Sequence, residues 1–314
     1  SYAMIVYWTA YMKANYTVEY MASVLTGDLQ GAAGAAKDAK LFASIEECKT
    51  LGLSVFGPDI HHSTFTFSTE GGAIRFGLSA VKGVGKSAID SILTARNKTP
   101  FINLKDFLLR VDLRKVNKKS VENLIKAGAM DSFGTRRALL EMYAGYLAVI
   151  QKEKKNMHVG QDSLFGVPQS QTVDELPDLP EYSESELFAL EKESIGFSIL
   201  HNPLNDYKAI LRKKVSKKAE DLSTDDVKKN YVMAGAISTV RKIYTKKDNK
   251  EMAFIELFDE TGSYEIVVFP KLFASTKKIW VEGGVVLMKA TIEARDDGIS
   301  VLVNDAIDLR LYNN

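Results

Sequence analysis

Cysteine and histidine are scarce in this sequence of 314 residues. Cys48 is the only cysteine, and the four histidines, His61, His62, His158 and His201, are scattered along the chain. A single cysteine excludes an intrachain disulfide framework and favours the cytoplasm as the compartment. Because the histidines have no cysteine partners at ligand spacing, we expect no zinc site and no metal ligands in this stretch.

Long apolar runs are also absent. No stretch approaches the roughly 18 apolar residues of a membrane span, and no signal peptide opens the chain. With 46% hydrophobic and 26% charged residues and a net charge of +1, we expect about two or three globular cores and no membrane partner. The chain begins at Ser1 inside a helical pattern and without an initiating methionine, which favours a fragment of a longer protein.

Two glycines separated by one residue form the most informative short motif, Lys82-Gly83-Val84-Gly85-Lys86-Ser87. Glycines at this spacing allow positive φ angles and let backbone amides approach a ligand closely. Ile89, Ile92 and Leu93 then recur at helical spacing, which predicts a helix over Lys86–Arg96. The amides and the positive end of that helix face the same way, as in phosphate sites, but the fingerprints of dinucleotide and P-loop sites are missing. The motif predicts a helix-hairpin-helix unit that contacts a nucleic-acid backbone; a plain connection between helices is the alternative.

A second unit of the same kind follows. Asn117 is a good N-cap for a helix that Gly128 ends, and Thr135 caps the next helix. The lysines close to this turn are Lys118, Lys119 and Lys126. Two such units side by side can hold both strands of a duplex near its minor groove. The alternative is that these lysines form the solvated face of a helical bundle.

The residues before the first unit are predicted to be mainly helical, from residue 1 to about 56. An aromatic stripe runs along this region through Tyr2, Tyr7, Trp8, Tyr11, Tyr16 and Tyr20. It suits packing or base stacking, and we expect packing. Alternation over Thr64–Ser68 predicts a short strand, and Gly71-Gly72 predicts a loop.

Two polar stretches, residues 151–160 and 167–180, are typical of linkers. Between them lies the segment Gln161-Asp162-Ser163-Leu164-Phe165. A Leu-Phe pair in a polar linker has no core of its own to join, so we expect it to dock elsewhere. The segment suits a short peptide that fills a hydrophobic pocket with Leu164 and Phe165 while Gln161 bonds the rim.

The C-terminal region changes to a period of two. Strands are predicted at Val232–Tyr244, Met252–Phe258, Tyr264–Phe269, Val285–Ala294 and Ile299–Ile307, with a helix at Leu272–Trp280. Five strands with one helix between the third and fourth are typical of an OB-fold. Basic residues flank the first loop, where such barrels hold single strands: Arg241, Lys242, Lys246, Lys247 and Lys250. Tyr244, Phe258 or Tyr264 is expected to offer a stacking face, and the others to join the core.

The fold class that follows is a multidomain α+β protein, an all-α helical region with tandem helix-hairpin-helix units before a small five-stranded OB-fold barrel. In this order, the motifs resemble the C-terminal half of bacterial DNA polymerase III alpha subunits, of the polymerase C family. The resemblance rests on Tyr7-Trp8-Thr9-Ala10-Tyr11-Met12-Lys13-Ala14, Leu51-Gly52, Pro58-Asp59-Ile60, Ile74 to Gly85, Leu124 to Ala129, Gln161 to Phe165, Glu191 to Phe197 and His201 to Leu204. Trp8 and Asn15 depart from the common pattern of the fingers region.

The resemblance implies a role for each segment: distal fingers at 1–72, tandem hairpins that bind duplex DNA at 73–158, a linker with the sliding-clamp motif at 159–183, a helical connection at 184–228, and a barrel for single-stranded template at 229–314. It implies Lys82, Gly83, Val84, Gly85, Lys86, Ser87, Lys118, Lys119, Lys126 and Gly128 as duplex contacts. The partners it implies are primed DNA, the sliding clamp (beta subunit) and other replisome subunits.

The catalytic palm with its magnesium ions is expected before Ser1, so we expect no catalytic residue and no cofactor in this stretch. The rival interpretation is a DNA repair or recombination factor that uses the same two modules. A structural scaffold with merely solubilising basic stretches is the third.

Overall fold

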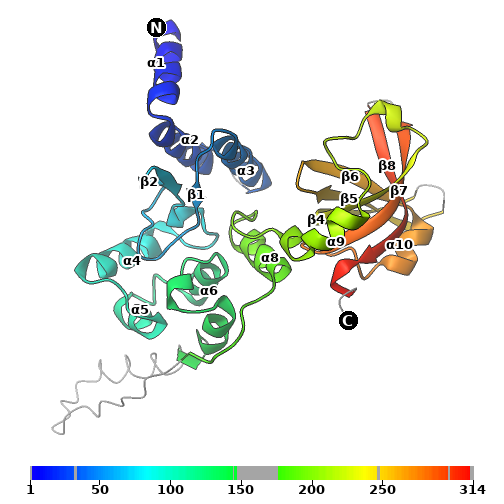
Figure 1. Ribbon diagram of the computed structural model, residues 1–314. Coiled ribbons are helices and arrows are strands. Elements are labelled where there is room, and N and C mark those ends of the chain that lie inside the picture. Colours follow the sequence, from blue (N-terminus) through cyan, green and yellow to red (C-terminus); the bar gives the residue numbers. More distant parts are fainter. Residues whose placement is uncertain are drawn as a thin grey trace, which may run out of the picture. The chain divides into compact units, whose positions relative to one another are not determined.

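The computed structural model describes residues 2–31, 34–143, 145–146, 176–245, 248–295 and 298–311 (Figure 1). The chain divides into two compact units, the first made of Ser1–Tyr182 and Leu190–Leu200, the second of Ser183–Ala189 and His201–Asn314. The predicted connection at 184–228 is therefore shared, since residues 190–200 belong to the first unit. None of the helices in the described ranges is long and apolar enough to cross a membrane.

The first unit begins with the helices α1 (Tyr2–Asn15), α2 (Thr17–Gly31) and α3 (Gly34–Thr50), as predicted, although the helical region ends at Thr50 and residues 55–56 form a strand. α2 buries Met21 and Leu25, and α3 contributes the buried Leu41, Ile45 and Cys48. In contrast, α1 buries no residue, and most of its aromatic stripe is exposed: Tyr2, Tyr7, Trp8, Tyr11 and, just beyond α1, Tyr16. The packing expected of the stripe is therefore wrong for these five side chains, because α1 extends away from the rest of the unit (Figure 1), but it is confirmed for Tyr20, which packs against the core.

A small sheet follows, made of β1 (Val55–Phe56), β2 (Ser68–Glu70) and β3 (Ala73–Arg75) in the order β1-β3-β2. The strand expected at Thr64–Ser68 is misplaced, since β2 begins only at Ser68. The carbonyls of Thr64 and Phe65 instead accept hydrogen bonds from Leu78 and Ser79, at 3.0 and 3.1 Å. The Gly71-Gly72 loop is confirmed, with φ angles of +59° and +84°.

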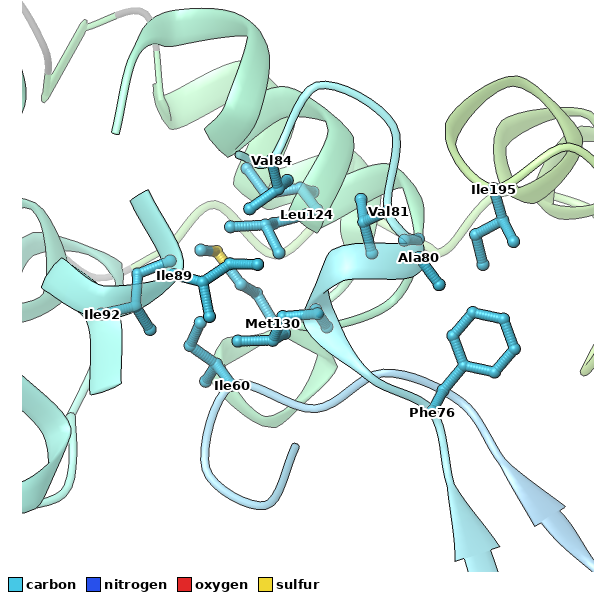
Figure 2. Close-up of a cluster of buried hydrophobic side chains, with 14 of the residues drawn as sticks. Ile60, Phe76, Ala80, Val81, Val84, Ile89, Ile92, Leu124, Met130 and Ile195 are labelled. Atoms are coloured by element: carbon cyan, nitrogen blue, oxygen red, sulfur yellow. The ribbon is translucent and has the colours of Figure 1, made fainter. Parts of the chain in front are cut away.

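Short helices build the remainder of the first unit. They are η1 (Leu78–Ala80), α4 (Lys86–Lys98), α5 (Leu104–Arg110), α6 (Lys118–Lys126), η2 (Asp131–Phe133), a helical segment at 136–143 and α8 (Glu184–Ser194), whose residues 190–194 belong to this unit. The predicted caps are confirmed: the Asn117 side chain accepts from the Ser120 amide at 3.0 Å, and the Thr135 hydroxyl from the Ala138 amide at 3.2 Å. Apolar side chains from these elements meet in one core (Figure 2).

The second unit is a closed barrel. Its strands are β4 (Asn230–Tyr244), β5 (Glu251–Phe258), β6 (Ser263–Val268), β7 (Val285–Arg295) and β8 (Gly298–Asp308), in the order β4-β5-β6-β8-β7. β6 and β8 are parallel, and the helix α10 (Pro270–Thr276) lies between β6 and β7 in the sequence. The OB-fold prediction is confirmed, although the helix ends at Thr276 rather than at Trp280. The segments η3 (Pro203–Tyr207), α9 (Lys208–Lys214), η4 (Thr224–Asp226) and η5 (Leu309–Leu311) complete the unit.

Candidate nucleic-acid interface

The Gly83 turn connects η1 to α4 and is anchored by one side chain. Val84 is buried in the core beside Leu124 of α6 (Figure 2), whereas Gly83 and Gly85 on either side are exposed. Gly83 has a φ angle of +76°, as expected for a turn glycine, but Gly85 is extended at −78°. Only Gly83 therefore uses the positive φ region expected of both glycines, while Gly85 serves as the N-cap of α4.

The turn presents unpaired backbone amides to solvent. Within the described ranges, no protein acceptor is recorded for the amides of Gly83, Gly85, Lys86 and Ser87, and no side chain caps α4. The first amides of a helix have no partner inside the helix, and they lie at the positive end of its dipole. Exposed amides in this arrangement form an anion site, and phosphate is the anion that such helix ends commonly bind.

Two buried side chains of α6 donate hydrogen bonds to carbonyl groups of this turn. The Asn123 amide group donates to the Lys82 carbonyl at 2.5 Å, and the Ser120 hydroxyl donates to the Gly83 carbonyl at 2.7 Å. Asn123 is only 6% exposed and Ser120 only 1%, so both donors are desolvated. The contact also brings the start of α6, with Lys118 and Lys119, beside the turn.

The predicted basic residues differ in how free their charges are. Lys86 and Lys119 are exposed, and no acidic partner is recorded for either in the described part of the chain. Lys118 lies 3.7 Å from Glu122, a loose pair on the surface.

Lys82 and Lys126 are paired more closely with acidic side chains. Lys82 lies 3.3 Å from Asp38, and Lys126 lies 2.7 Å from Glu193. The positive charge available beside the Gly83 turn therefore comes mainly from Lys86 and Lys119.

The Gly128 turn after α6 is built differently. Gly128 has a φ angle of +81°, but a Cβ placed there would lie 2.2 Å from an Arg136 guanidinium nitrogen. That guanidinium, on a side chain 1% exposed, contacts Asp131 at 3.0 Å and Glu191 at 3.3 Å and donates to the Lys126 carbonyl at 3.0 Å. Burial lowers the pKa of Arg136, but Asp131 and Glu191 more than offset this and raise it above its usual value. Arg136 thus fills the space beside Gly128, and the amides of this turn already have acceptors: Gly128 donates to the Ile125 carbonyl at 3.0 Å and Ala129 to the Leu124 carbonyl at 2.9 Å.

One face of the barrel gathers basic and aromatic side chains. Arg241 lies over the Phe254 ring at 5.0 Å and 3.6 Å from Glu265, and Arg295 lies 3.8 Å from the same Glu265. Side chains from β4 and β7, the strands that precede the first and fourth loops, therefore meet at Glu265. Loops at these positions bind nucleic acid in OB-folds. Tyr244, at the end of β4, is 63% exposed.

The other two candidate stacking residues, the buried Tyr264 and the half-buried Phe258, pack against the protein's own groups. Tyr264 is 9% exposed, and its hydroxyl donates to the Ala234 carbonyl at 3.0 Å. Burial raises the pKa of Tyr264 far above its usual value, and the charge of Asp259 raises it further. Phe258 packs on Phe188 with ring centres 5.7 Å apart. Tyr244 is therefore the residue of the three that offers an open aromatic face.

Of the other predicted basic residues near the first loop, Lys242 is exposed, and Lys250 lies 3.7 Å from Asp248. Lys246 and Lys247 lie outside the described residues, as does the docking segment Gln161–Phe165. The sequence interpretation missed Arg295 and Phe254. Arg295 was recognisable, because it directly follows the predicted strand Val285–Ala294 and so begins the fourth loop, one of the loops that bind nucleic acid in OB-folds.

Comparisons with known proteins agree with both modules. A family profile described as a helix-hairpin-helix motif matches residues 52–140, and one described as an OB-fold nucleic acid binding domain matches residues 231–309. The chain is 35% identical over 97% of its length to DNA polymerase III subunit alpha of Mycobacterium tuberculosis. Identities with the proteins of the same name are 33% over 98% of the chain in Borreliella burgdorferi and 36% over 93% in Aquifex aeolicus. The family resemblance expected from the sequence is confirmed.

The chain spans about a quarter of the length of these relatives: 26% of the first, 27% of the second and 23% of the third. Among solved structures, it is similar to the second OB-fold domain of replication protein A from Methanococcus maripaludis. The two have 14% sequence identity and a TM-score of 0.23, over 30% of this chain and 93% of the other.

Proposed function

We propose that this chain, which is homologous over nearly its full length to about a quarter of DNA polymerase III subunit alpha, is the DNA-holding part of a replicative polymerase of that family. The observation that carries the proposal is the Gly83 turn. Its exposed amides at the N-terminus of α4, with Lys86 and Lys119 beside them, provide donors and positive charge for a phosphate.

The two modules divide the work between forms of DNA. The hairpin unit binds duplex through its sugar-phosphate backbone, where contacts from backbone amides and lysines to phosphates carry no sequence information. The barrel binds single-stranded template, with Arg241 and Arg295 on phosphates and Tyr244 stacked on a base. Most of the affinity in both modules comes from phosphate charge, so binding is weakened by salt and nearly independent of sequence.

The chemistry of nucleotide addition belongs to the remainder of the longer protein. Nucleotidyl transfer needs carboxylates that hold two metal ions against the nucleotide phosphates. We place these carboxylates and their magnesium ions in a palm ahead of this stretch, so that this stretch alone binds DNA without extending a primer. We place the intact protein in the cytoplasm with the other replisome subunits.

The segment Gln161–Phe165 gives the complex its second attachment. In this proposal, Leu164 and Phe165 fill a pocket on a sliding clamp that encircles the duplex. Once the clamp is bound, rebinding to DNA becomes intramolecular, and the effective concentration set by the linker keeps the complex on its template.

Fluorescence anisotropy with labelled single-stranded, duplex and primed DNA tests the proposal on residues 1–314. We expect all three to bind, with log affinity falling linearly as log salt concentration rises. A chain that binds none of them, or binds with no dependence on salt, contradicts it. Template-dependent primer extension by this stretch alone contradicts the assignment of catalysis to the missing part.

The clamp attachment has its own test. Leu164→Ala combined with Phe165→Ala is expected to abolish capture of the chain by immobilised clamp and to leave duplex affinity unchanged. Equal clamp affinity for the double variant and the unmodified chain rejects the assignment of this segment.

A further inference from the structure

The carbonyl groups of the Gly83 turn are held inward by buried donors. The Asn123 amide group bonds the Lys82 carbonyl, and the Ser120 hydroxyl bonds the Gly83 carbonyl. Both side chains come from α6, about forty residues further along the chain, and both are almost fully buried. The Asn123 and Ser120 side chains therefore do not face the solvent, where DNA would lie.

The geometry of a peptide bond links these inward contacts to the outward amides. In a trans peptide unit, the C=O and the following N–H point in opposite directions. When Asn123 holds the Lys82 carbonyl toward the core, the Gly83 N–H must point away from the core. Ser120 holds the carbonyl of the next peptide, between Gly83 and Val84. The N–H of that peptide, on Val84, donates to the Val81 carbonyl at 3.2 Å and closes the turn.

The close fit beneath the turn supports this arrangement. A Cβ at position 83 would lie 3.3 Å from the Asn123 side-chain nitrogen, so the turn rests directly on its donor. Just before the turn, the Lys82 amide donates to the Ser194 carbonyl at 2.7 Å, and this bond fixes the start of the turn. With its entry and two carbonyls fixed, the turn has little freedom to rotate the Gly83 amide inward.

We infer that Asn123 and Ser120 are positioning residues that set the duplex affinity of the hairpin unit without touching DNA themselves. Asn123 aims the Gly83 amide at a phosphate, and Ser120 holds the next peptide and so preserves the conformation of the turn. The inference rests on the proposed function, since it assumes that the open turn is the phosphate site. Two buried, uncharged side chains of α6 then contribute to duplex affinity, in addition to the exposed lysines of the same helix.

The test compares Asn123→Leu with Lys86→Ala in the 314-residue chain by duplex anisotropy at several salt concentrations. Asn123→Leu keeps a similar volume and removes the donor, and we expect an affinity loss of about tenfold, as for one hydrogen bond to a charged group. Because no charge is removed, the slope of log affinity against log salt should stay unchanged. Lys86→Ala should reduce the magnitude of that slope by about 0.9.

Amide NMR of the folded protein separates aiming from mere stability. In the unmodified chain, addition of a short duplex should shift the Gly83 amide resonance, and in Asn123→Leu this shift should be lost while the Lys86 and Ser87 amides still respond. Thermal unfolding and single-strand binding by the barrel confirm that each variant is intact. If Asn123→Leu does not fold, Ser120→Ala and Ser120→Thr decide, because only threonine keeps the hydroxyl donor and should retain duplex affinity.

The outcomes distinguish the inference from the function on which it rests. Unchanged duplex affinity in Asn123→Leu, or in Ser120→Ala where that variant decides, overturns the inference alone, provided that Lys86→Ala still lowers the salt slope. Salt-independent or absent duplex binding by the unmodified chain overturns the proposed function, and the inference with it.

Discussion

The Gly83 and Gly128 turns appear alike in the sequence and differ in the structure. Each has a positive-φ glycine near lysines and helix ends. At Gly83, the amide is exposed and no acceptor for it is found in the described ranges, whereas the Gly128 amide donates to the Ile125 carbonyl at 3.0 Å and the Ala129 amide to the Leu124 carbonyl at 2.9 Å. A glycine turn therefore becomes a candidate phosphate site only where the protein's own carbonyls leave its amides without acceptors.

The largest difference between the turns should appear when Arg136 is replaced. Arg136→Leu leaves the buried carboxylate of Glu191 without its cationic partner, and loss of one member of a buried ion pair costs about 3–5 kcal/mol. We expect the free energy of unfolding of the first unit, measured in urea, to fall by about this amount. The neighbouring exposed Arg137→Leu is the matched control and should change it little. Equal stability of the two variants contradicts the structural role of Arg136.

The two turns should also respond differently to an added methyl group. Gly128→Ala strains a φ of +81° and collides with Arg136, so we expect a loss of about 1–3 kcal/mol in the urea midpoint analysis. Gly85→Ala has an extended backbone and no atom within 4 Å, so its stability should be unchanged. Its methyl group would occupy open space next to the unpaired amides at the start of α4, so we expect duplex affinity to drop. If Gly128→Ala is as stable as the unmodified chain, or Gly85→Ala binds duplex with unchanged affinity, the proposed difference between the two turns is contradicted.

The barrel contains a similar contrast between tyrosines. Tyr244→Ala should lower single-strand affinity by about 1–2 kcal/mol through loss of one stacking face, with no loss of stability. Tyr264→Phe removes only the hydroxyl that bonds the Ala234 carbonyl, so we expect a stability loss of about 1 kcal/mol and unchanged affinity. Anisotropy and thermal unfolding on both variants measure the two effects. An affinity loss in Tyr264→Phe equal to that in Tyr244→Ala refutes the assignment.

The smallest effects should come from lysines in different pairing states. Lys86→Ala is expected to weaken duplex binding and flatten its salt dependence, because none of the acidic side chains in the described ranges pairs with its charge. Lys126→Ala removes a charge already compensated by Glu193, so its effect on duplex affinity should be less than half as large. The stability cost of losing this exposed pair should not exceed about 1 kcal/mol. Equal salt slopes in the two variants contradict the ranking.

Periodicity and turn chemistry predicted most of the fold correctly. Apolar spacing located α4 and α6, Asn117 and Thr135 marked helix starts, and alternation located the barrel strands to within about two residues. These features succeed because they depend on local backbone preferences and on one buried face. The strand expected at Thr64–Ser68 failed for the opposite reason, since its carbonyls bond a distant segment.

The candidate site was less accessible from sequence. The open Gly83 turn follows from its glycines, but the support from Asn123 and Ser120 and the closure of Gly128 by Arg136 depend on contacts across the fold. The exposure of the aromatic stripe on α1 was also invisible, because helical spacing shows which residues share a face and not whether anything covers it. Charge pairing at Lys82 and Lys126 has the same origin in tertiary contacts.

Hydrogen exchange of the 314-residue chain, with and without a short duplex at low salt, tests the central claim most directly. The account predicts that duplex slows exchange of the amides of Gly83, Gly85, Lys86 and Ser87 and leaves those of Gly128 and Ala129 unchanged. Slowed exchange at Gly128 and Ala129 with no change at Gly83–Ser87, in a chain that binds the duplex, would contradict it.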